Sequence, residues 1–219
     1  MTFGAMRTVY GTLLNFRAEV AAWSPRMNQA PYQAPPKAPV LYIKPANTWS
    51  ANGAAIALPA RVPEVELGAT IAMVMKSAQE VAGYVLMNDL SIPHDSFFRP
   101  PVKFKCLDGF LGVGDRVRAR NEAGDPAIFK LEVRINGELK QTVRFADLVR
   151  PAERLLAEVS EFMTLQPGDA LMLGCDIVPG SGPGNGSGSG RPRARAGDRI
   201  EISMPALGTL ANTLVAEAA

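Results

Sequence analysis

The sequence predicts a β-rich α+β fold with few helices, and three observations support this prediction. Its 219 residues include 18 prolines and 20 glycines, which indicates many turns and short elements rather than a helical bundle. Short apolar runs bounded by turn residues outnumber runs with helical periodicity. Asn136-Gly137 joins two such runs, and this dipeptide readily takes the positive backbone angles of a tight hairpin turn. Because 47% of the residues are hydrophobic, we expect one domain over residues 1–219.

The N-terminal half contains apolar runs that predict four strands: residues 6–14, 40–44, 64–75 and 83–90. Five prolines fall within residues 24–39, so we expect this segment to wrap the surface without lasting helix or sheet structure. The third strand begins half-polar and continues almost wholly apolar, which predicts that its second half is buried. A brief connection at residues 77–82, which could form one helical turn, joins it to the fourth strand.

The C-terminal half begins with the hairpin of residues 129–145 and continues with a helix. Apolar residues recur at three- and four-residue spacing up to Met163, which predicts an amphipathic helix that begins near Asp147 or Pro151 and packs on the sheet. Three further strands are expected at residues 170–175, 199–204 and 210–216. Residues 179–190 contain only Pro, Gly, Ser and Asn, so we expect a flexible loop; no Gly-Lys-Ser/Thr sequence supports a phosphate-binding loop.

Charge and cysteine content exclude several classes of function. A net charge of +2 provides no large basic field, so nucleic-acid binding lacks electrostatic support and a small or acidic ligand fits better. Two cysteines and one histidine cannot form a disulfide framework or a multi-histidine metal site. No apolar run approaches the roughly 20 residues that cross a bilayer, so we expect a cytoplasmic protein without membrane contact. Arg191, Arg193 and Arg195 are expected to be solvated at the approach to a strand.

Glu64 and Glu66 are the first candidate site residues. They are two positions apart on a predicted strand, so both side chains leave the same face. Adjacent carboxylates persist in a partly buried site only when they are protonated, paired with cations or bridged by a metal ion. The alternative is that this end of the strand lies at the surface and both side chains face water.

Asp89 adds a third carboxylate at the end of the next apolar strand, and sequential strands are usually neighbours. Three carboxylates with water suit Mg²⁺ or Mn²⁺ and leave positions open for a substrate. Lys44 ends the strand of residues 40–44. Lys105 ends the stretch of residues 102–105, in which apolar and basic residues alternate. A desolvated lysine can bind a carboxylate or donate a proton, whereas a solvated side chain is the simpler alternative for either lysine alone.

A set of ordered stretches spans essentially the whole chain: Ala38–Pro45, Glu64-x-Glu66-Leu67, Val81–Tyr84, Asn88-Asp89, Lys105, Val133–Leu139 and Ser160–Asp169. This set resembles the fumarylacetoacetate hydrolase family. The resemblance implies a mixed sheet rolled into a barrel-like β-sandwich, with the functional site at one open end. It also implies that Glu64, Glu66 and Asp89 bind Mg²⁺ or Mn²⁺, and that Lys44 and Lys105 face the substrate.

Four further stretches are Tyr32–Lys37, Asn88–Pro93, Ser96–Pro100 and Lys105–Phe110. They resemble one branch of the family, the N-terminal half of the bifunctional isomerase/decarboxylases of 4-hydroxyphenylacetate (homoprotocatechuate) catabolism. Such halves occur fused or as separate subunits, and the chain resembles a free-standing N-terminal subunit. The resemblance therefore implies a homodimer or a hetero-oligomer with a homologous second subunit.

Several positions depart from the family pattern. Glu19 stands where the hydrolases carry a histidine, and Ala22 stands where they carry the glutamate that follows it, so water activation is not expected. Pro93 replaces an arginine, so a different cation, Arg99, is expected to hold a substrate carboxylate. Gly174-Cys175-Asp176 replaces Gly-Thr-Pro, so substrate contacts are not carried over there.

The resemblance, taken with these residues, implies a metal-dependent lyase (decarboxylase) or isomerase that acts on an unsaturated 2-oxo or oxo-tricarboxylic acid. The metal ion would hold the substrate carboxylate and adjacent carbonyl oxygen and stabilise an enolate, through which both reactions pass. Lys105 would donate a proton or anchor a carboxylate, with Lys44 beside it. His94 is expected to be incidental unless its closeness to the site makes it a proton carrier.

Two alternatives remain open. The first is a weakly catalytic subunit that completes an oligomer with a homologous active chain. The departures at Glu19, Ala22, Pro93 and Cys175 favour it, whereas the three retained carboxylates favour an enzyme. The second is an acylpyruvate-type hydrolase, in which Glu19 would have to replace the histidine.

Overall fold

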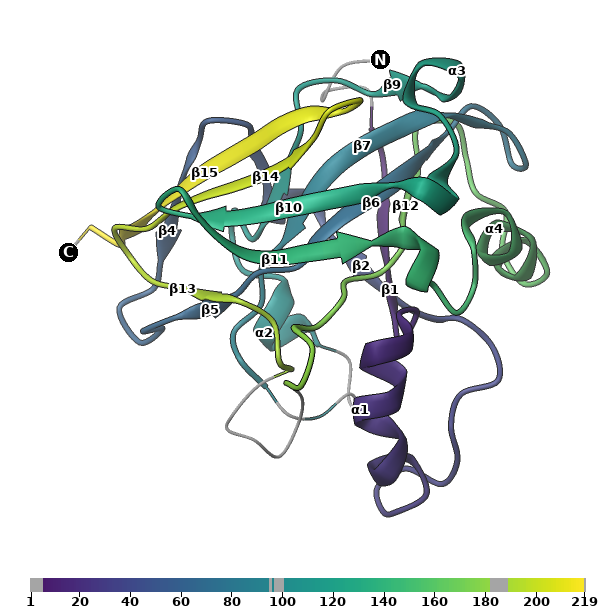
Figure 1. The fold of residues 1–219 in the computed structure, drawn as a ribbon, viewed down its shortest axis with the longest axis horizontal. Helices are drawn as coiled ribbons and strands as arrows, with labels where there is room; N and C mark the ends of the chain where they lie inside the picture. Colours follow the sequence, from purple (N-terminus) through teal and green to yellow (C-terminus); the bar gives the residue numbers. More distant parts are fainter. Residues whose placement is uncertain (1–5, 95, 97–100, 182–188, 219) are drawn as a thin grey trace.

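Two β-sheets that share one hydrophobic core form most of the structure (Figure 1). The computed structural model describes residues 6–94, 96, 101–181 and 189–218. The larger, mixed sheet has eight strands, in the order β2 (Val40–Lys44), β1 (Val9–Leu13), β12 (Ala170–Met172), β6 (Ala69–Met75), β7 (Val81–Asp89), β8 (Leu111–Val113) and β3 (Trp49–Ala51), with β9 (Arg118–Ala119) paired to β7. The smaller sheet has five strands: β11 (Glu138–Arg144), β10 (Lys130–Ile135), β14 (Arg199–Met204), β15 (Gly208–Ala216) and β4 (Ala55–Leu58).

The remaining elements are short. A two-stranded ladder joins β13 (Arg193–Ala194) to β5 (Val65–Glu66). The α-helices of the described residues are α1 (Arg17–Met27), α2 (Val102–Lys105), α3 (Arg120–Ala123) and α4 (Ala152–Ser160). Three 3-10 helices are η2 (Ala46–Thr48), η3 (Pro126–Ile128) and η4 (Phe145–Asp147). The predicted β-rich α+β class with few helices is therefore confirmed.

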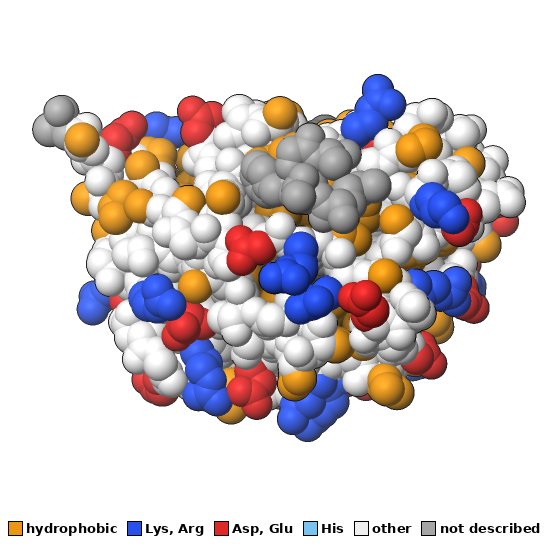
Figure 2. Space-filling view, turned by 90° about the horizontal axis from the view of Figure 1, so that it is seen from above, with side chains coloured by type: hydrophobic (Ala, Val, Ile, Leu, Met, Phe, Trp, Pro, Cys, Tyr) orange, Lys and Arg blue, Asp and Glu red, His pale blue; other side chains and the backbone are white. Residues whose placement is uncertain are grey.

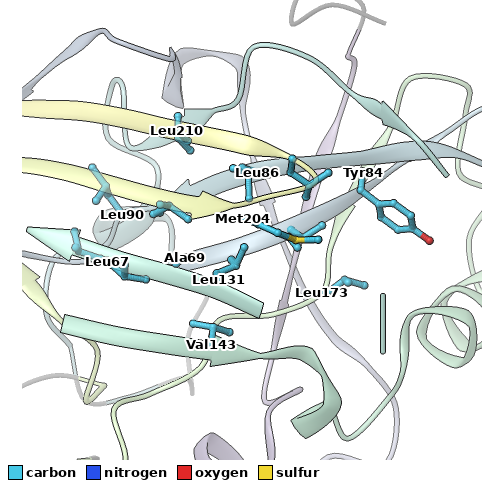
Figure 3. Close-up of a cluster of buried hydrophobic side chains, with 14 of the residues drawn as sticks. Leu67, Ala69, Tyr84, Leu86, Leu90, Leu131, Val143, Leu173, Met204 and Leu210 are labelled. Carbon is cyan, nitrogen blue, oxygen red and sulfur yellow. The ribbon is translucent and has the colours of Figure 1, made fainter. Parts of the chain in front are cut away.

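The main hydrophobic core lies between the two sheets (Figure 3). Ile71 of β6 and Leu131 of β10 meet there, and both are fully buried. A second cluster covers the opposite face of the larger sheet, where Ala72 of β6 packs in the same cluster as Trp23 of α1. Because both faces of β6 are buried, its sequence is a continuous apolar run rather than an alternation of polar and apolar residues.

Several local predictions are confirmed. Asn136 and Gly137 have φ angles of 51° and 82°, the positive values that the tight hairpin turn between β10 and β11 requires. The strands predicted at residues 40–44 and 199–204 have those bounds. The predicted helix near residue 151 is α4, which ends at Ser160, so Phe162 lies beyond it and is 58% exposed.

Two local predictions are wrong in part. The proline-rich segment of residues 24–39 begins inside α1, which continues through Pro25 to Met27, whereas residues 28–39 form no helix or strand and are mostly exposed, as predicted. Pro25 lies near the helix end and removes one backbone donor, while buried Trp23 and Met27 anchor the helix by packing. The strand predicted at residues 64–75 is divided, since β5 pairs with β13 whereas β6 pairs with β7 and β12.

Figure 2 shows one face of the molecule, on which acidic and basic side chains are interspersed. No large area of this face carries charge of one sign. This distribution agrees with the net charge of +2. Among the helices of the described residues, none combines the length and the hydrophobicity that crossing a membrane requires.

Candidate functional site

The junction of β5 and β7 places Glu66 and Asp89 on one face of a single antiparallel ladder. Glu66 pairs with Ser91, and the Asp89 amide donates to the carbonyl of Gly68 at 2.9 Å. Residues 66 and 68 on one strand and 89 and 91 on the other therefore share a face. This confirms the expectation that the two segments are neighbours, and it places the two carboxylates diagonally across the ladder.

Gly68 allows the close approach of the two segments at this point. A Cβ atom at Gly68 would lie 2.4 Å from the carbonyl oxygen of Asp89 and 2.9 Å from the sulfur of Cys175. Any side chain at position 68 would therefore push Asp89 and Cys175 away from the ladder.

Asp89 is the centre of a buried ionic cluster. Its Oδ1 lies 3.0 Å from Lys44 Nζ and its Oδ2 lies 2.5 Å from Lys105 Nζ. The hydroxyl of Tyr42 also donates to Oδ2. Burial alone would raise the pKa of Asp89, but the two lysines and the hydroxyl hold that pKa well below its ordinary value. Asp89 is therefore ionised, and both of its oxygens contact positive or donating groups.

Lys44 connects three segments of the chain. Its ammonium group pairs with Asp89 and donates to the carbonyl oxygens of Lys105 and Phe110, the latter at 2.8 Å. Burial lowers the pKa of Lys44, and the adjacent Asp89 carboxylate opposes that shift. Because three protein oxygens surround this ammonium group, Lys44 fixes the positions of Asp89 and of the end of α2.

Lys105 and Tyr42 complete this cluster. Lys105 Nζ lies 5.1 Å from the centre of the Tyr42 ring, within the range of a cation–π contact. The Tyr42 ring lies over Gly11 of the paired strand β1. A Cβ atom at position 11 would lie 2.0 Å from this ring. Burial and the Asp89 charge raise the pKa of Tyr42 well above its ordinary value, so its hydroxyl keeps its proton. The sequence analysis did not single out Tyr42, although its spacing of two from Lys44 was a usable signal.

Glu66 is held by Ser189. The Ser189 amide donates to Glu66 Oε1 and the Ser189 hydroxyl donates to Oε2, both at 2.7 Å. Ser189 is fully buried, although it belongs to the Gly/Ser/Pro segment of residues 179–190 that the sequence predicts to be a flexible loop. Residues 182–188 of that segment lie outside the described residues, so the flexible loop stays a prediction; at Ser189 the segment supplies two donors to the buried Glu66 carboxylate.

Glu64 lies at the edge of the cluster rather than inside it. Its side chain is 41% exposed, and Oε1 lies 2.5 Å from Arg193 Nη1. Arg193 Nη2 also approaches Glu66 Oε1 at 3.9 Å. The two glutamates therefore share a face as predicted, but an arginine stands between them.

Arg191 forms a second buried ion pair, with Glu19 of α1. Arg191 Nη2 donates to Glu19 Oε1 at 2.6 Å and to the Cys175 carbonyl at 3.0 Å, and Nη1 donates to the Ser189 hydroxyl at 3.1 Å. Burial raises the pKa of Glu19, and Arg191 only partly opposes this shift. The expectation that Arg191 is solvated is wrong, because the paired carboxylate lies 172 positions away in the sequence.

Cys175 and His94 flank the two ion pairs. Burial raises the pKa of the Cys175 thiol to about 12, and both described cysteines are reduced as expected. His94 is buried, stacks on Phe104 at 4.7 Å between ring centres, and contacts the Ile92 carbonyl at 3.0 Å through Nδ1. Burial lowers its pKa, so the imidazole is neutral near pH 7. Arg99, the predicted carboxylate-binding cation, lies outside the described residues.

The arrangement does not match an open site for Mg²⁺ or Mn²⁺. Asp89 contacts two ammonium groups, both Glu66 oxygens accept hydrogen bonds, and Glu64 pairs with an arginine. In the part of the chain that the structure describes, no three His, Cys, Asp or Glu side chains are grouped as a metal ion would require. The metal-binding role of these three carboxylates remains a prediction.

Comparison with known proteins places the chain among related sequences. It matches the family model described as fumarylacetoacetate (FAA) hydrolase C-terminal over residues 8–215. It is 38% identical to the 4-hydroxyphenylacetate degradation bifunctional isomerase/decarboxylase of Salmonella dublin, over 96% of this chain and 47% of that protein. It is 40% identical to the protein of the same name from Escherichia coli, over 76% of this chain and 40% of that protein. The chain thus spans about half the length of these curated relatives.

Solved structures share the fold. The 5-carboxymethyl-2-hydroxymuconate delta-isomerase of Mycobacterium smegmatis superposes with a TM-score of 0.74 at 23% identity, covering 98% of this chain and 81% of that chain. Fumarylpyruvate hydrolase of Pseudomonas aeruginosa, solved with Mn²⁺ and pyruvate, gives 0.74 at 20% identity, covering 97% and 91%. Together with a family match that spans almost the whole sequence, this shared fold shows that the chain belongs to the fumarylacetoacetate hydrolase family.

Proposed function

We propose that this chain is a decarboxylase/isomerase that acts on an unsaturated 2-oxo or oxo-tricarboxylic acid through an enolate. The reactions would be those of 4-hydroxyphenylacetate catabolism: decarboxylation of 5-oxopent-3-ene-1,2,5-tricarboxylate and isomerisation of 2-hydroxyhepta-2,4-diene-1,7-dioate. The observation that carries the proposal is the buried cluster of Asp89, Lys44, Lys105 and Tyr42, in a chain 38–40% identical to bifunctional isomerase/decarboxylases.

An ammonium group and a phenol in a buried site can stabilise negative charge on oxygen. In decarboxylation, the bond to the departing carboxylate breaks, CO₂ leaves, and the electron pair becomes the enolate. In isomerisation of the dienol, the 2-hydroxyl proton passes to solvent, which leaves the same kind of enolate, and a proton is then added at a carbon of the diene to give the 2-oxo product. Lys105 is placed to hold the enolate oxygen or to deliver that proton, because its Nζ contacts only Asp89 and the face of Tyr42 among the described contacts.

Lys44 has a different role in this proposal. Its ammonium group is surrounded by Asp89 and two backbone carbonyls, so it acts by holding Asp89 and Lys105 in place. Divalent-metal dependence is typical of the family. In this chain Asp89, Glu66 and Glu64 are engaged by lysines, Ser189 and Arg193, so stabilisation of the enolate oxygen is assigned to Lys105.

The test is turnover of a panel of unsaturated 2-oxo acids by the purified chain, followed by CO₂ release and by loss of the dienol absorbance. We expect Lys105→Met to reduce kcat by about 100-fold or more, the usual scale for loss of a proton-transfer group. Lys76→Met is the control, since Lys76 is exposed and pairs only with Glu80 on the surface. Full activity of Lys105→Met, or no turnover of any panel member, would contradict the proposal.

Two other functions are favoured by particular observations. The departures from the family pattern at Ala22, Pro93 and Cys175 favour a partner subunit that needs a homologous second chain. In that case activity would emerge only on mixing the two chains, and light scattering would distinguish the predicted homodimer from a hetero-oligomer. Glu19 Oε2 has no hydrogen-bond partner among the described residues, which favours water activation and an acylpyruvate-type hydrolase. Release of pyruvate from an acylpyruvate would identify that activity.

A further inference from the structure

Arg191 is the only buried arginine of the described residues, and its hydrogen bonding is incomplete. Both Nη atoms donate to protein oxygens, whereas Nε has no partner among the described residues. The hydrogen bonding of its partner carboxylate, Glu19, is also incomplete, since Oε2 has no side-chain or backbone hydrogen-bond partner assigned among the described residues. An unused donor and an unused acceptor on one buried ion pair indicate that a polar group belongs beside it.

The position of Arg191 links this ion pair to the cluster around Asp89. Arg191 donates to the Ser189 hydroxyl, which in turn donates to Glu66 on the ladder that carries Asp89. Arg191 also donates to the carbonyl of Cys175, whose sulfur borders Asp89 at Gly68. The guanidinium group therefore faces the same buried region as the proposed reaction centre.

The charge of the buried cluster limits what it can bind. Glu19, Glu66 and Asp89 supply three negative charges, and Lys44, Lys105 and Arg191 supply three positive charges. A di- or tricarboxylate would add negative charge to a neutral buried cluster, and buried charge without compensation is costly. A planar guanidinium is suited to bind a carboxylate, but the Glu19 charge beside it opposes such binding.

We propose that Arg191 anchors a substrate carboxylate remote from the reacting carbon, and that Glu19 takes up one solvent proton on Oε2 as this carboxylate binds. The inference deepens the proposed function, on which it rests, because it names the residue that binds the second carboxylate of these substrates and the group that compensates its charge. Proton uptake leaves the Arg191 charge available to the substrate. Arg191 then supplies the cation that the family pattern has at the position of Pro93.

The groups around Glu19 support this assignment. Burial raises the pKa of Glu19, and the charge of Asp176 acts in the same direction. The Arg191 charge, a backbone hydrogen bond from Leu14 and the Lys105 charge lower the pKa of Glu19, in that order of size. A bound carboxylate would add a second negative charge near Oε2, so protonation of Glu19 becomes more favourable as the substrate binds.

Calorimetry at pH 7, in two buffers of different ionisation enthalpy, tests the proposal without turnover. The probes are succinate, glutarate and adipate, with butyrate as the monocarboxylate reference. We expect at least one dicarboxylate to bind the wild type more tightly than butyrate does, with uptake of about one proton. Glu19→Gln should bind it at least as tightly with no proton uptake. Arg191→Gln should lose at least about tenfold in affinity for it, and Arg195→Gln, an exposed control, should match the wild type.

Three results would overturn the inference. They are equal binding of dicarboxylates and butyrate by the wild type, dicarboxylate binding without proton uptake, and unchanged binding by a folded Arg191→Gln variant. Circular dichroism establishes folding, and if Arg191→Gln does not fold, the proton count of Glu19→Gln against the wild type decides alone. Because no turnover is measured, failure here is distinct from an inactive substrate panel, which would contradict the proposed function instead.

Discussion

Asp89 and Glu19 are both buried carboxylates of the same cluster, yet their pKa values shift in opposite directions. Asp89 contacts two ammonium groups and a phenol, and its pKa is lowered despite burial. Glu19 pairs with one guanidinium and is also near the backbone amide of Leu14, but no ammonium group contacts it, and burial raises its pKa. The difference shows that the number of donors and cations around a buried carboxylate, rather than burial itself, decides its charge.

This contrast separates a fixed part of the site from an adjustable part. Both oxygens of Asp89 contact a lysine, and Lys44 is surrounded by protein oxygens, so this part positions groups and keeps its charges. The ion pair of Glu19 and Arg191 has an unused donor and an unused acceptor, so it can exchange a proton or bind a polar group. The same cluster can therefore be rigid at the reaction centre and responsive where a second carboxylate is recognised.

The largest expected effect is that of Asp89→Asn. The amide keeps the shape of the side chain but leaves Lys44 and Lys105 buried without a counter-charge, so we expect a loss of about 3–5 kcal/mol in the free energy of unfolding. Urea denaturation at pH 7 measures this loss. A loss below about 1 kcal/mol would show that the two lysines do not depend on Asp89 for compensation.

Glu19→Gln should cost less, about 1–2 kcal/mol, because the folded protein already disfavours the Glu19 charge and the amide oxygen can still accept from Arg191. The pH dependence of the stability difference between the wild type and this variant gives a second test. Since the pKa of Glu19 is raised from 4.5 on folding, its contribution to stability is complete below that value and is lost as pH rises through the folded pKa.

The stability difference between wild type and Glu19→Gln should therefore be largest near pH 4 and should shrink toward neutral pH. Parallel urea titrations across this range measure the difference. A difference that grows with rising pH would mean that Glu19 is a stabilising carboxylate of the same kind as Asp89, and the contrast between the two residues would disappear.

Manganese binding tests whether Lys44 and Lys105 neutralise Asp89 in place of a metal ion. Lys105→Met removes one buried ammonium group. It should strengthen Mn²⁺ binding by about tenfold relative to the wild type, because Lys105 no longer competes with Mn²⁺ for the Asp89 carboxylate. Paramagnetic resonance of chelator-stripped protein measures bound Mn²⁺, and Lys76→Met is the surface control. Tight binding of one ion by the wild type, lost in Glu66→Ala, would instead confirm the metal site that the sequence predicts.

The smallest effect concerns the two cysteines. Burial raises the pKa of Cys175 to about 12, whereas Cys106 is partly exposed. Iodoacetamide at pH 8 should therefore modify the native protein slowly at Cys106 and leave Cys175 unmodified until denaturant is added. Mass spectrometry locates the label. Rapid labelling of native Cys175 would show that the space between Asp89 and Arg191 is open to solvent.

Local pattern determined much of the fold and part of the site. The Asn-Gly turn, the strand of residues 40–44 and the strand of residues 199–204 depend on dihedral preference and apolar spacing, which short windows of sequence carry. Strand position and charge pattern singled out Glu64, Glu66, Asp89, Lys44 and Lys105, and the family resemblance gave them roles; the structure brings Lys44, Lys105 and Asp89 into contact. The helical extension through Pro25 was missed because packing of distant residues outweighs a local break.

Tertiary structure alone decided which groups compensate the buried charges. Tyr42 reaches Asp89 across 47 positions, Ser189 reaches Glu66 across 123, and Arg191 reaches Glu19 across 172. No periodicity links residues so far apart, and a serine or arginine in a Gly/Ser-rich or basic stretch reads as solvated until its partner is known. The sequence specified which charges the chain has to bury; the fold selected their partners, because a buried charge is stable only where donors from other segments converge on it.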